Sequence, residues 1–160
     1  MQATLQDTVR TLIIPMQGCN LLLPNVAVAE VVPYMQPHEI DGAPEWLLGT
    51  ISWRGLNIPL ISYDRMQGLD VRNGLVQARI AVINRIRPDS GLSFYAVVMA
   101  GIPQLKRVSG DTLQEMSVEG GAGDPGTVQV GDIAAVIPDL DALELAVAQV
   151  YHEYSRQTGS

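Results

Sequence analysis

The sequence predicts a mostly β-sheet domain, built as a barrel or a sandwich. Short apolar runs alternate with turn residues at roughly ten-residue spacing, which is typical of all-β domains. Apolar residues make up 47% of the 160 residues, whereas aromatic residues make up only 5%. The chain therefore has enough apolar residues for a core, which must be mainly aliphatic, in one domain or in two small subdomains.

The first apolar runs predict a β-hairpin. Residues 10–16 and 21–24 supply its strands, and residues 17–20 supply the polar and glycine residues of its turn. A loop rich in proline, glycine and acidic residues follows at 33–44. After it, we expect residues 45–48 to form one helical turn that ends at Gly49.

Between the hairpin and that loop, residues 26–32 predict a further strand. Alternate side chains of a strand share a face. On one face a single carboxylate stands among valines: Val26, Val28, Glu30 and Val32. A lone carboxylate in an apolar row needs a partner or an exposed rim, which makes Glu30 the first unusual feature of the chain.

A second hairpin is predicted after Gly49. Residues 50–53 form one strand, Arg54-Gly55 a tight turn, and residues 56–63 the other strand. Pro59 lies inside that second strand and cannot donate to a sheet ladder. We therefore expect Pro59 at a sheet edge or at a bulge.

The second half of the chain continues the pattern of short strands. Residues 80–86 and 92–99 are joined by a turn at 87–91, and 102–108 predict one further strand. The glycine-rich segment 120–126 is expected to form a loop tip. Residues 128–137 are long enough for one or two strands.

The last element differs, because its apolar residues recur at helical spacing. They are Leu140, Leu143, Val147, Val150, Tyr151 and Tyr154. The pattern predicts an amphipathic helix over about 139–156, with Asp139 as its N-cap. Its apolar stripe can pack on the chain's own sheets or on a partner, and packing on its own sheets is the preferred interpretation.

Charge and composition exclude several classes of function. The net charge is −7 without a run of Lys or Arg, so nucleic acid and anionic membrane surfaces are disfavoured. Cys19 is the sole cysteine, which excludes an internal disulfide and a multi-cysteine metal site. The polar stretch 1–10 lacks a signal core, and no apolar run approaches the ~20 residues of a membrane span. We expect a cytoplasmic protein without direct membrane insertion.

No catalytic or cofactor motif is present in the sequence. His38 and His152 lack the local partners of a nucleophilic or zinc site. Asp139, Asp141 and Glu144 are interpreted as the start and the solvated face of the last helix. The glycine-rich segment has no following Lys-Ser or Lys-Thr pair, so it is not a phosphate loop. The sequence therefore favours a binding module without enzymatic activity, cofactor or metal.

Four short segments, in order, resemble the CheW-like family of bacterial chemosensory coupling proteins. They are Leu23-Pro24, Val28-Ala29-Glu30-Val31, the block Gly49-Thr50-Ile51-Ser52-Trp53-Arg54-Gly55, and Ile58-Pro59-Leu60-Ile61. The family pattern has a Val-x-Glu-Val strand and a later Asn-Leu-Arg-Gly block, and a Pro follows at the position of Pro59. Departures are Ser62-Tyr63 for the usual Asp-Leu, Met99-Ala100 for Val-Asp, and Trp53 for Leu. They make the chain a divergent member.

The resemblance implies a fold and a function. The fold would be two intertwined five-stranded SH3-like barrels with a C-terminal helix, as a single CheW-like domain over residues 1–160. The protein would be a non-enzymatic adaptor at membrane-associated receptor arrays. It would couple the cytoplasmic tips of chemoreceptors to the regulatory domain of a CheA-type histidine kinase.

The resemblance also assigns candidate partner-binding residues. Val28 would be an apolar contact in the groove for the receptor, with Glu30 and Arg54 as an ion pair beside it and Gly55 allowing close approach. Gly49 would lie toward the kinase, and Ile80 is a weaker candidate from the other barrel. Two alternatives stay open: the ion pair only braces two strands, or the glycines only satisfy a positive φ.

Two other functions are compatible with the sequence. One is an accessory CheW-like protein that binds the kinase or the receptor but not both, which the departures allow. The other is a small-molecule-binding β-barrel, which requires an enclosed pocket with convergent polar groups.

Overall fold

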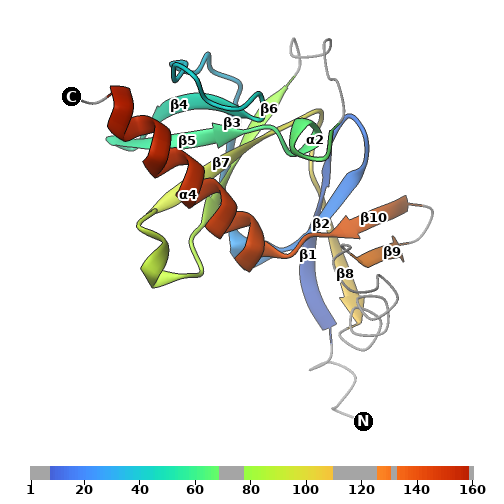
Figure 1. The fold of residues 1–160 in the computed structure, drawn as a ribbon. Coiled ribbons are helices and arrows are strands. Elements are labelled where there is room, and N and C mark those ends of the chain that lie inside the picture. The colour runs from blue at the N-terminus through green and yellow to red at the C-terminus, as the bar shows by residue number, and fades with distance from the viewer. Residues whose placement is uncertain (1–7, 69–77, 110–125, 131–132, 159–160) are drawn as a thin grey trace.

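A computed structural model describes residues 8–68, 78–109, 126–130 and 133–158 (Figure 1). The first of two sheets contains β1 (Thr8–Pro15), β2 (Asn20–Pro24), β8 (Gln104–Ser109), β9 (Gly126–Val130) and β10 (Ile133–Ile137). The second contains β3 (Val28–Pro33), β4 (Leu47–Trp53), β5 (Leu56–Ile61), β6 (Arg79–Asn84) and β7 (Phe94–Met99). The helical segments are η1 (Asn25–Ala27), α2 (Tyr63–Met66), η3 (Pro88–Ser90) and α4 (Leu140–Thr158).

The two sheets are interleaved along the chain. The first has the strand order β8-β1-β2-β10-β9 and takes strands from both ends of the chain. The second has the order β3-β6-β7-β5-β4 and is built from the middle. The predicted fold class, mostly β with two five-stranded units and a C-terminal helix, is confirmed.

Three apolar clusters explain why the strands carry nearly continuous apolar runs. One cluster lies within the second sheet and includes Ile80 and Val82, and a smaller one lies within the first. The largest cluster joins both sheets and α4, and it includes Ala81 and Ile83. Alternate residues of β6 therefore face two different clusters, and both faces of the strand are buried.

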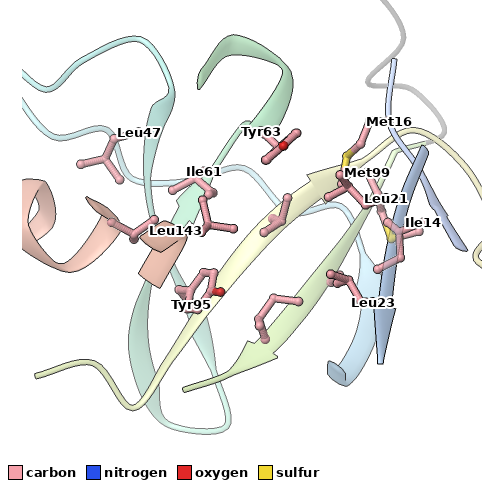
Figure 2. Packing of buried hydrophobic residues seen from close by; sticks show 14 of the residues in the cluster. Ile14, Met16, Leu21, Leu23, Leu47, Ile61, Tyr63, Tyr95, Met99 and Leu143 are labelled. Carbon is pink, nitrogen blue, oxygen red and sulfur yellow. The ribbon is translucent and has the colours of Figure 1, made fainter. Parts of the chain in front are cut away.

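Figure 2 shows the shared cluster. Ile14 and Leu21 from the first sheet lie near Met99 from the second, and Leu143 of α4 lies near Ile61 and Tyr95. The predicted packing of the helix stripe on the chain's own sheets is confirmed by Leu143 and Val147, which are buried in this cluster together with Ala148. Burying a Leu or Val side chain contributes about 1.5–3 kcal/mol. The shared cluster is thus what holds the two sheets and α4 together.

The predicted start of α4 is also confirmed. Asp139 accepts a hydrogen bond from the backbone N–H of Ala142 through Oδ1, at 3.1 Å, as an N-cap side chain does. The interpretation of Glu144 as part of a solvated face was wrong, because its side chain is fully buried. Glu144 lies next to Leu143 and three residues before Val147, so the helix turns it toward the sheet.

Several local predictions were corrected. The helical turn at 45–48 was wrong: a turn closed by the Leu47 N–H and the Pro44 carbonyl, at 3.0 Å, leads directly into β4. Pro59 was expected at a sheet edge or at a bulge. The edge alternative was wrong, since β5 lies between β4 and β7, and the irregularity in the β4–β5 ladder lies just beyond Pro59, where Leu47 and Gly49 pair with Ile61 and Leu60. Pro59 precedes the short stretch that pairs with β7, which begins at Leu60. The chain after β5 forms α2 instead of continuing as a strand, with Ser62 as its N-cap.

The loop tip predicted at 120–126 lies outside the described residues up to Pro125, and Gly126 begins β9. The segment 128–137 contains parts of two strands, β9 and β10, which pair antiparallel. The first hairpin, β1 with β2, and the strands β6 to β8 lie within a few residues of their predicted bounds.

Candidate protein-binding site

The β4–β5 hairpin positions the candidate arginine. Trp53 and Leu56 are the last paired residues, and Arg54 and Gly55 form the two-residue turn with φ of +49° and +79°. Positive φ at both central residues defines a type I′ turn, whose twist matches that of paired strands. The predicted tight turn is confirmed, and it holds the exposed Arg54 side chain at the end of the second sheet.

A bulge in β3 positions the candidate glutamate. Val28 pairs with Ile83 and Glu30 with Val82, so Ala29 is an extra residue in the ladder. The bulge shifts the alternation of side chains by one. The prediction that 26, 28, 30 and 32 share a face was therefore wrong: Val28 packs against the shared cluster and Val32 against that of the second sheet. Val26 belongs to η1 and is largely exposed.

Glu30, Trp53 and Arg54 form one cluster, which we call the Glu30 cluster. Glu30 Oε1 lies 3.1 Å from Arg54 Nη2 and also accepts a hydrogen bond from Trp53 Nε1–H at 3.0 Å. The Arg54 guanidinium carbon lies 4.8 Å from the centroid of the Trp53 ring, within cation–π distance. The side chains of Arg54 and Glu30 are 69% and 40% exposed, so the pair lies at the surface.

From the sequence, Trp53 was notable only because the family pattern has Leu at this position. Its ring is buried edge-on against Phe94, with centroids 4.8 Å apart and planes at 67°. A Leu side chain at this position has no N–H to donate, so the indole of Trp53 gives Glu30 a second partner. The available signal was a rare aromatic residue beside the candidate arginine, in a chain with two tryptophans.

Gly49 and Gly55 have different roles in the backbone. Gly49 has a φ of +143°, and a Cβ there would overlap with the carbonyl of His38. His38 lies this close because its N–H and carbonyl bond to Thr50 across the edge of β4, at 2.8 and 2.9 Å. Among the described residues no atom lies within 4 Å of a Cβ position at Gly55, so its φ of +79° is what favours glycine there.

Val28 and Ile80 differ in their access to a partner. Val28 is partly buried at the start of β3, where it leaves some side-chain surface exposed. Ile80 is 0% exposed within the cluster of the second sheet, because it points into the interior of that unit. The structure therefore brings Glu30 and Arg54 together near the surface, and it does not bring Ile80 to that surface.

Two other carboxylates are buried and bind backbone N–H groups. Asp64 of α2 accepts from Gln17 N–H at 2.9 Å and from Gly18 N–H at 3.0 Å, which links α2 to the β1–β2 turn. Glu144 of α4 accepts from Ile86 N–H at 2.7 Å and from Arg87 N–H at 3.1 Å. Both join segments that are distant in sequence.

These carboxylates also act on neighbouring acidic groups. Burial, and secondarily the charge of Asp64, raise the pKa of the Cys19 thiol. Burial, with a smaller effect of Glu144, raises the pKa of the Tyr95 hydroxyl. Both groups are thus held in their neutral form at pH 7, as structural rather than reactive side chains.

One cleft in the described part of the chain has a volume of about 170 Å³. It is lined partly by Tyr34, Leu48, Asp64 and Met99. Ligand pockets typically measure about 300–1,000 Å³, so this cleft is small for an organic ligand. No three potential metal ligands gather among the described residues, and no helix among them is long and apolar enough to cross a membrane.

Two interleaved five-stranded sheets define a mostly β protein, and its candidate site is an exposed charged cluster at the end of the second sheet. A model of the CheW-like domain family matches residues 10–146, and the chain belongs to this family. The resemblance of the four segments is thereby confirmed.

The fold is similar to the crystal structure of the scaffolding protein TtCheW from Thermoanaerobacter tengcongensis, with a TM-score of 0.66. The sequences are 16% identical, and the match covers 81% of this chain and 87% of that chain. A search of curated proteins gave no match.

Proposed function

We propose that the chain is a non-enzymatic adaptor that couples chemoreceptors to a CheA-type histidine kinase in a chemotaxis-type signalling system. Its membership of the CheW-like family supports this class of function. The observation that carries the proposal is the Glu30 cluster, an ion pair left exposed at the end of the second sheet. An exposed pair contributes only about 0–1 kcal/mol to stability, so a partner is the better reason for its arrangement.

The receptor tip binds as a helical hairpin at β3, with the Glu30 cluster on one side of the strand and Val28 on the other contacting different parts of the hairpin. The partly buried Val28 supplies apolar area, and the charged pair supplies hydrogen-bonding groups that select a polar residue of the helix. Trp53 holds Glu30 in place before the partner arrives, which reduces the entropy lost on binding. The turn at Gly55 leaves open space beside Arg54 for a helix to approach.

The kinase regulatory domain binds elsewhere, on the side of β4 that carries Gly49 and His38. Gly49 acts there by letting the His38 segment lie against β4, rather than by touching the kinase itself. Simultaneous binding of both partners recruits this chain to membrane-associated receptor arrays from the cytoplasm. Individually weak contacts gain strength in such an array through multivalency. Ile80 is buried and is left out of the proposed contacts.

Titration calorimetry of the full chain tests the proposal with two probes, a receptor-tip hairpin fragment and a kinase regulatory domain. Arg54→Ala is expected to weaken receptor-tip binding about tenfold, or roughly 1.4 kcal/mol, while kinase binding stays within twofold. Arg85→Ala, at an exposed cation with no contact to the Glu30 cluster, is the matched control and is expected to bind both normally.

Binding of neither fragment refutes the adaptor function. Binding of one fragment only assigns the chain to an accessory role with a single partner. If Arg54→Ala unfolds the protein at 25 °C, the ion pair is a structural brace and the contact assignment fails.

A further inference from the structure

A second surface, on the first sheet, is formed by the outer edge of β8 and its neighbours. Strand β8 is the last strand of its sheet and pairs only with β1 in the described part of the chain. Edge strands expose unpaired backbone N–H and C=O groups that can pair with another strand. The edge of β4 differs, because His38 covers it with two hydrogen bonds.

The side chains along this edge are apolar and basic. Ile102 and Leu105 are 68% and 58% exposed, unusually high for large aliphatic side chains. Lys106 and Arg107 follow in the strand and are exposed, as is Arg10, which lies directly opposite Arg107 on β1. None of the three cations lies within ion-pair distance of a carboxylate in the part of the chain that the structure describes.

The charge on this edge contrasts with that of the whole chain. Three of the ten Lys and Arg residues lie on these two strands, although the net charge is −7. Lysine alone on an edge is a common device against strand pairing. Exposed Ile102 and Leu105 beside the cations do not serve that purpose, because they offer an incoming strand apolar surface.

We propose that the β8 edge binds an acidic, extended segment of another protein by strand addition. Leu105 and Arg107 lie on one face of β8 with Leu12 and Arg10 opposite them, and Lys106 lies on the other face. An added strand therefore fits best with two adjacent acidic residues, one opposite Arg107 and one opposite Lys106, and an apolar residue opposite Leu105. Main-chain hydrogen bonds provide affinity and these side chains provide specificity.

This surface is independent of the proposed receptor site. Glu30 and Arg54 belong to the second sheet and β8 to the first, and Figure 1 shows β8 on the side of the molecule away from β4. A partner on β8 therefore leaves the Glu30 cluster accessible.

The test uses the full chain and a labelled peptide with two adjacent glutamates flanked by valine and threonine. Fluorescence anisotropy is expected to show binding that weakens about tenfold from about 50 mM to 500 mM salt, because screening shortens the range of the charges. The same peptide with lysines in place of the glutamates is expected not to bind. Amide resonances of β8 are expected to shift with the first peptide.

The double variant Lys106→Glu/Arg107→Glu is expected to weaken binding at least tenfold without changing the circular dichroism spectrum. Arg85→Glu is the matched control and is expected to bind normally. Arg54→Ala is also expected to bind this peptide normally, so failure of this proposal is distinguishable from failure of the receptor site.

Three results would overturn the proposal. The first is no binding at about 1 mM peptide, well above the range of a specific contact. The second is binding that is unchanged in the double variant. The third is an edge already occupied, seen as slow hydrogen exchange of the outward β8 amides without peptide, or as a dimer that the double variant dissociates.

Discussion

Glu30 differs from Asp64 and Glu144 in what surrounds its carboxylate. Asp64 and Glu144 are buried, and each accepts two backbone N–H groups from a distant segment. Glu30 is 40% exposed, and within the described part of the chain its Oε1 contacts side chains, those of Trp53 and Arg54. The buried carboxylates thus hold segments of the fold together, whereas the exposed one arranges side chains at a surface.

The difference in exposure between these carboxylates predicts which of them stabilise the fold and which bind a partner. A buried group left without its partner costs about 1–3 kcal/mol, whereas an exposed ion pair contributes about 0–1 kcal/mol. Substitutions at Asp64 and Glu144 should therefore act on the free energy of unfolding. Substitutions at Glu30 and Arg54 should act mainly on a partner, and the following experiments order these effects by size.

The largest effect is expected for Glu144→Ala. The substitution leaves the N–H groups of Ile86 and Arg87 without their acceptor and removes a fully buried side chain. We expect the free energy of unfolding to fall by about 3 kcal/mol, measured by urea denaturation.

Glu153→Ala, at an exposed glutamate of the same helix, is the control and should change stability by less than about 0.5 kcal/mol. Equal losses for the two variants would show that Glu144 does not hold α4 to the sheet.

The sequence allowed part of this arrangement to be predicted. Turn residues between apolar runs indicated the β fold, because they mark where strands end. The helical spacing around Leu143 and Val147 indicated α4. The same spacing places Glu144 on the buried face. Because acidic side chains are usually exposed, Glu144 was nevertheless predicted to face solvent. Its burial depends on two N–H groups from the segment after β6, which no local pattern reveals.

Of the Glu30 cluster, the sequence allowed only the Glu30–Arg54 ion pair to be predicted. The resemblance indicated Glu30 and Arg54, which the structure places 3.1 Å apart. Trp53 was missed because its hydrogen bond to Glu30 depends on how β3 and β4 lie within the second sheet. The bulge at Ala29, which directs Glu30 and Val28 to different sides, depends on the register with β6 and has no sequence signature here.

An intermediate effect is expected for Asp64→Ala. The substitution removes the acceptor for Gln17 and Gly18, whose N–H groups lie in an exposed turn that water can reach. Because the Asp64 residue is 5% exposed and Glu144 is 0% exposed, water replaces the Asp64 carboxylate more readily, and we expect a loss of about 2 kcal/mol in the free energy of unfolding, less than for Glu144.

Asp41→Ala, at an exposed aspartate, is the matched control and should be nearly neutral. Faster hydrogen exchange confined to the β1–β2 turn would locate the loss. A loss larger than that of Glu144→Ala would contradict the role of solvent in this comparison.

The smallest effect is expected for the coupling between Glu30 and Arg54. A double-mutant cycle with Glu30→Gln and Arg54→Gln removes the charges singly and together, and urea denaturation gives the coupling free energy. Because both side chains are exposed, solvent screens their attraction, and we expect a coupling below about 1 kcal/mol. The same cycle measured on receptor-tip binding should give a larger coupling, since a bound helix excludes water from the pair. A coupling of about 2 kcal/mol or more in stability would instead class Glu30 with Asp64 and Glu144, as a brace between strands.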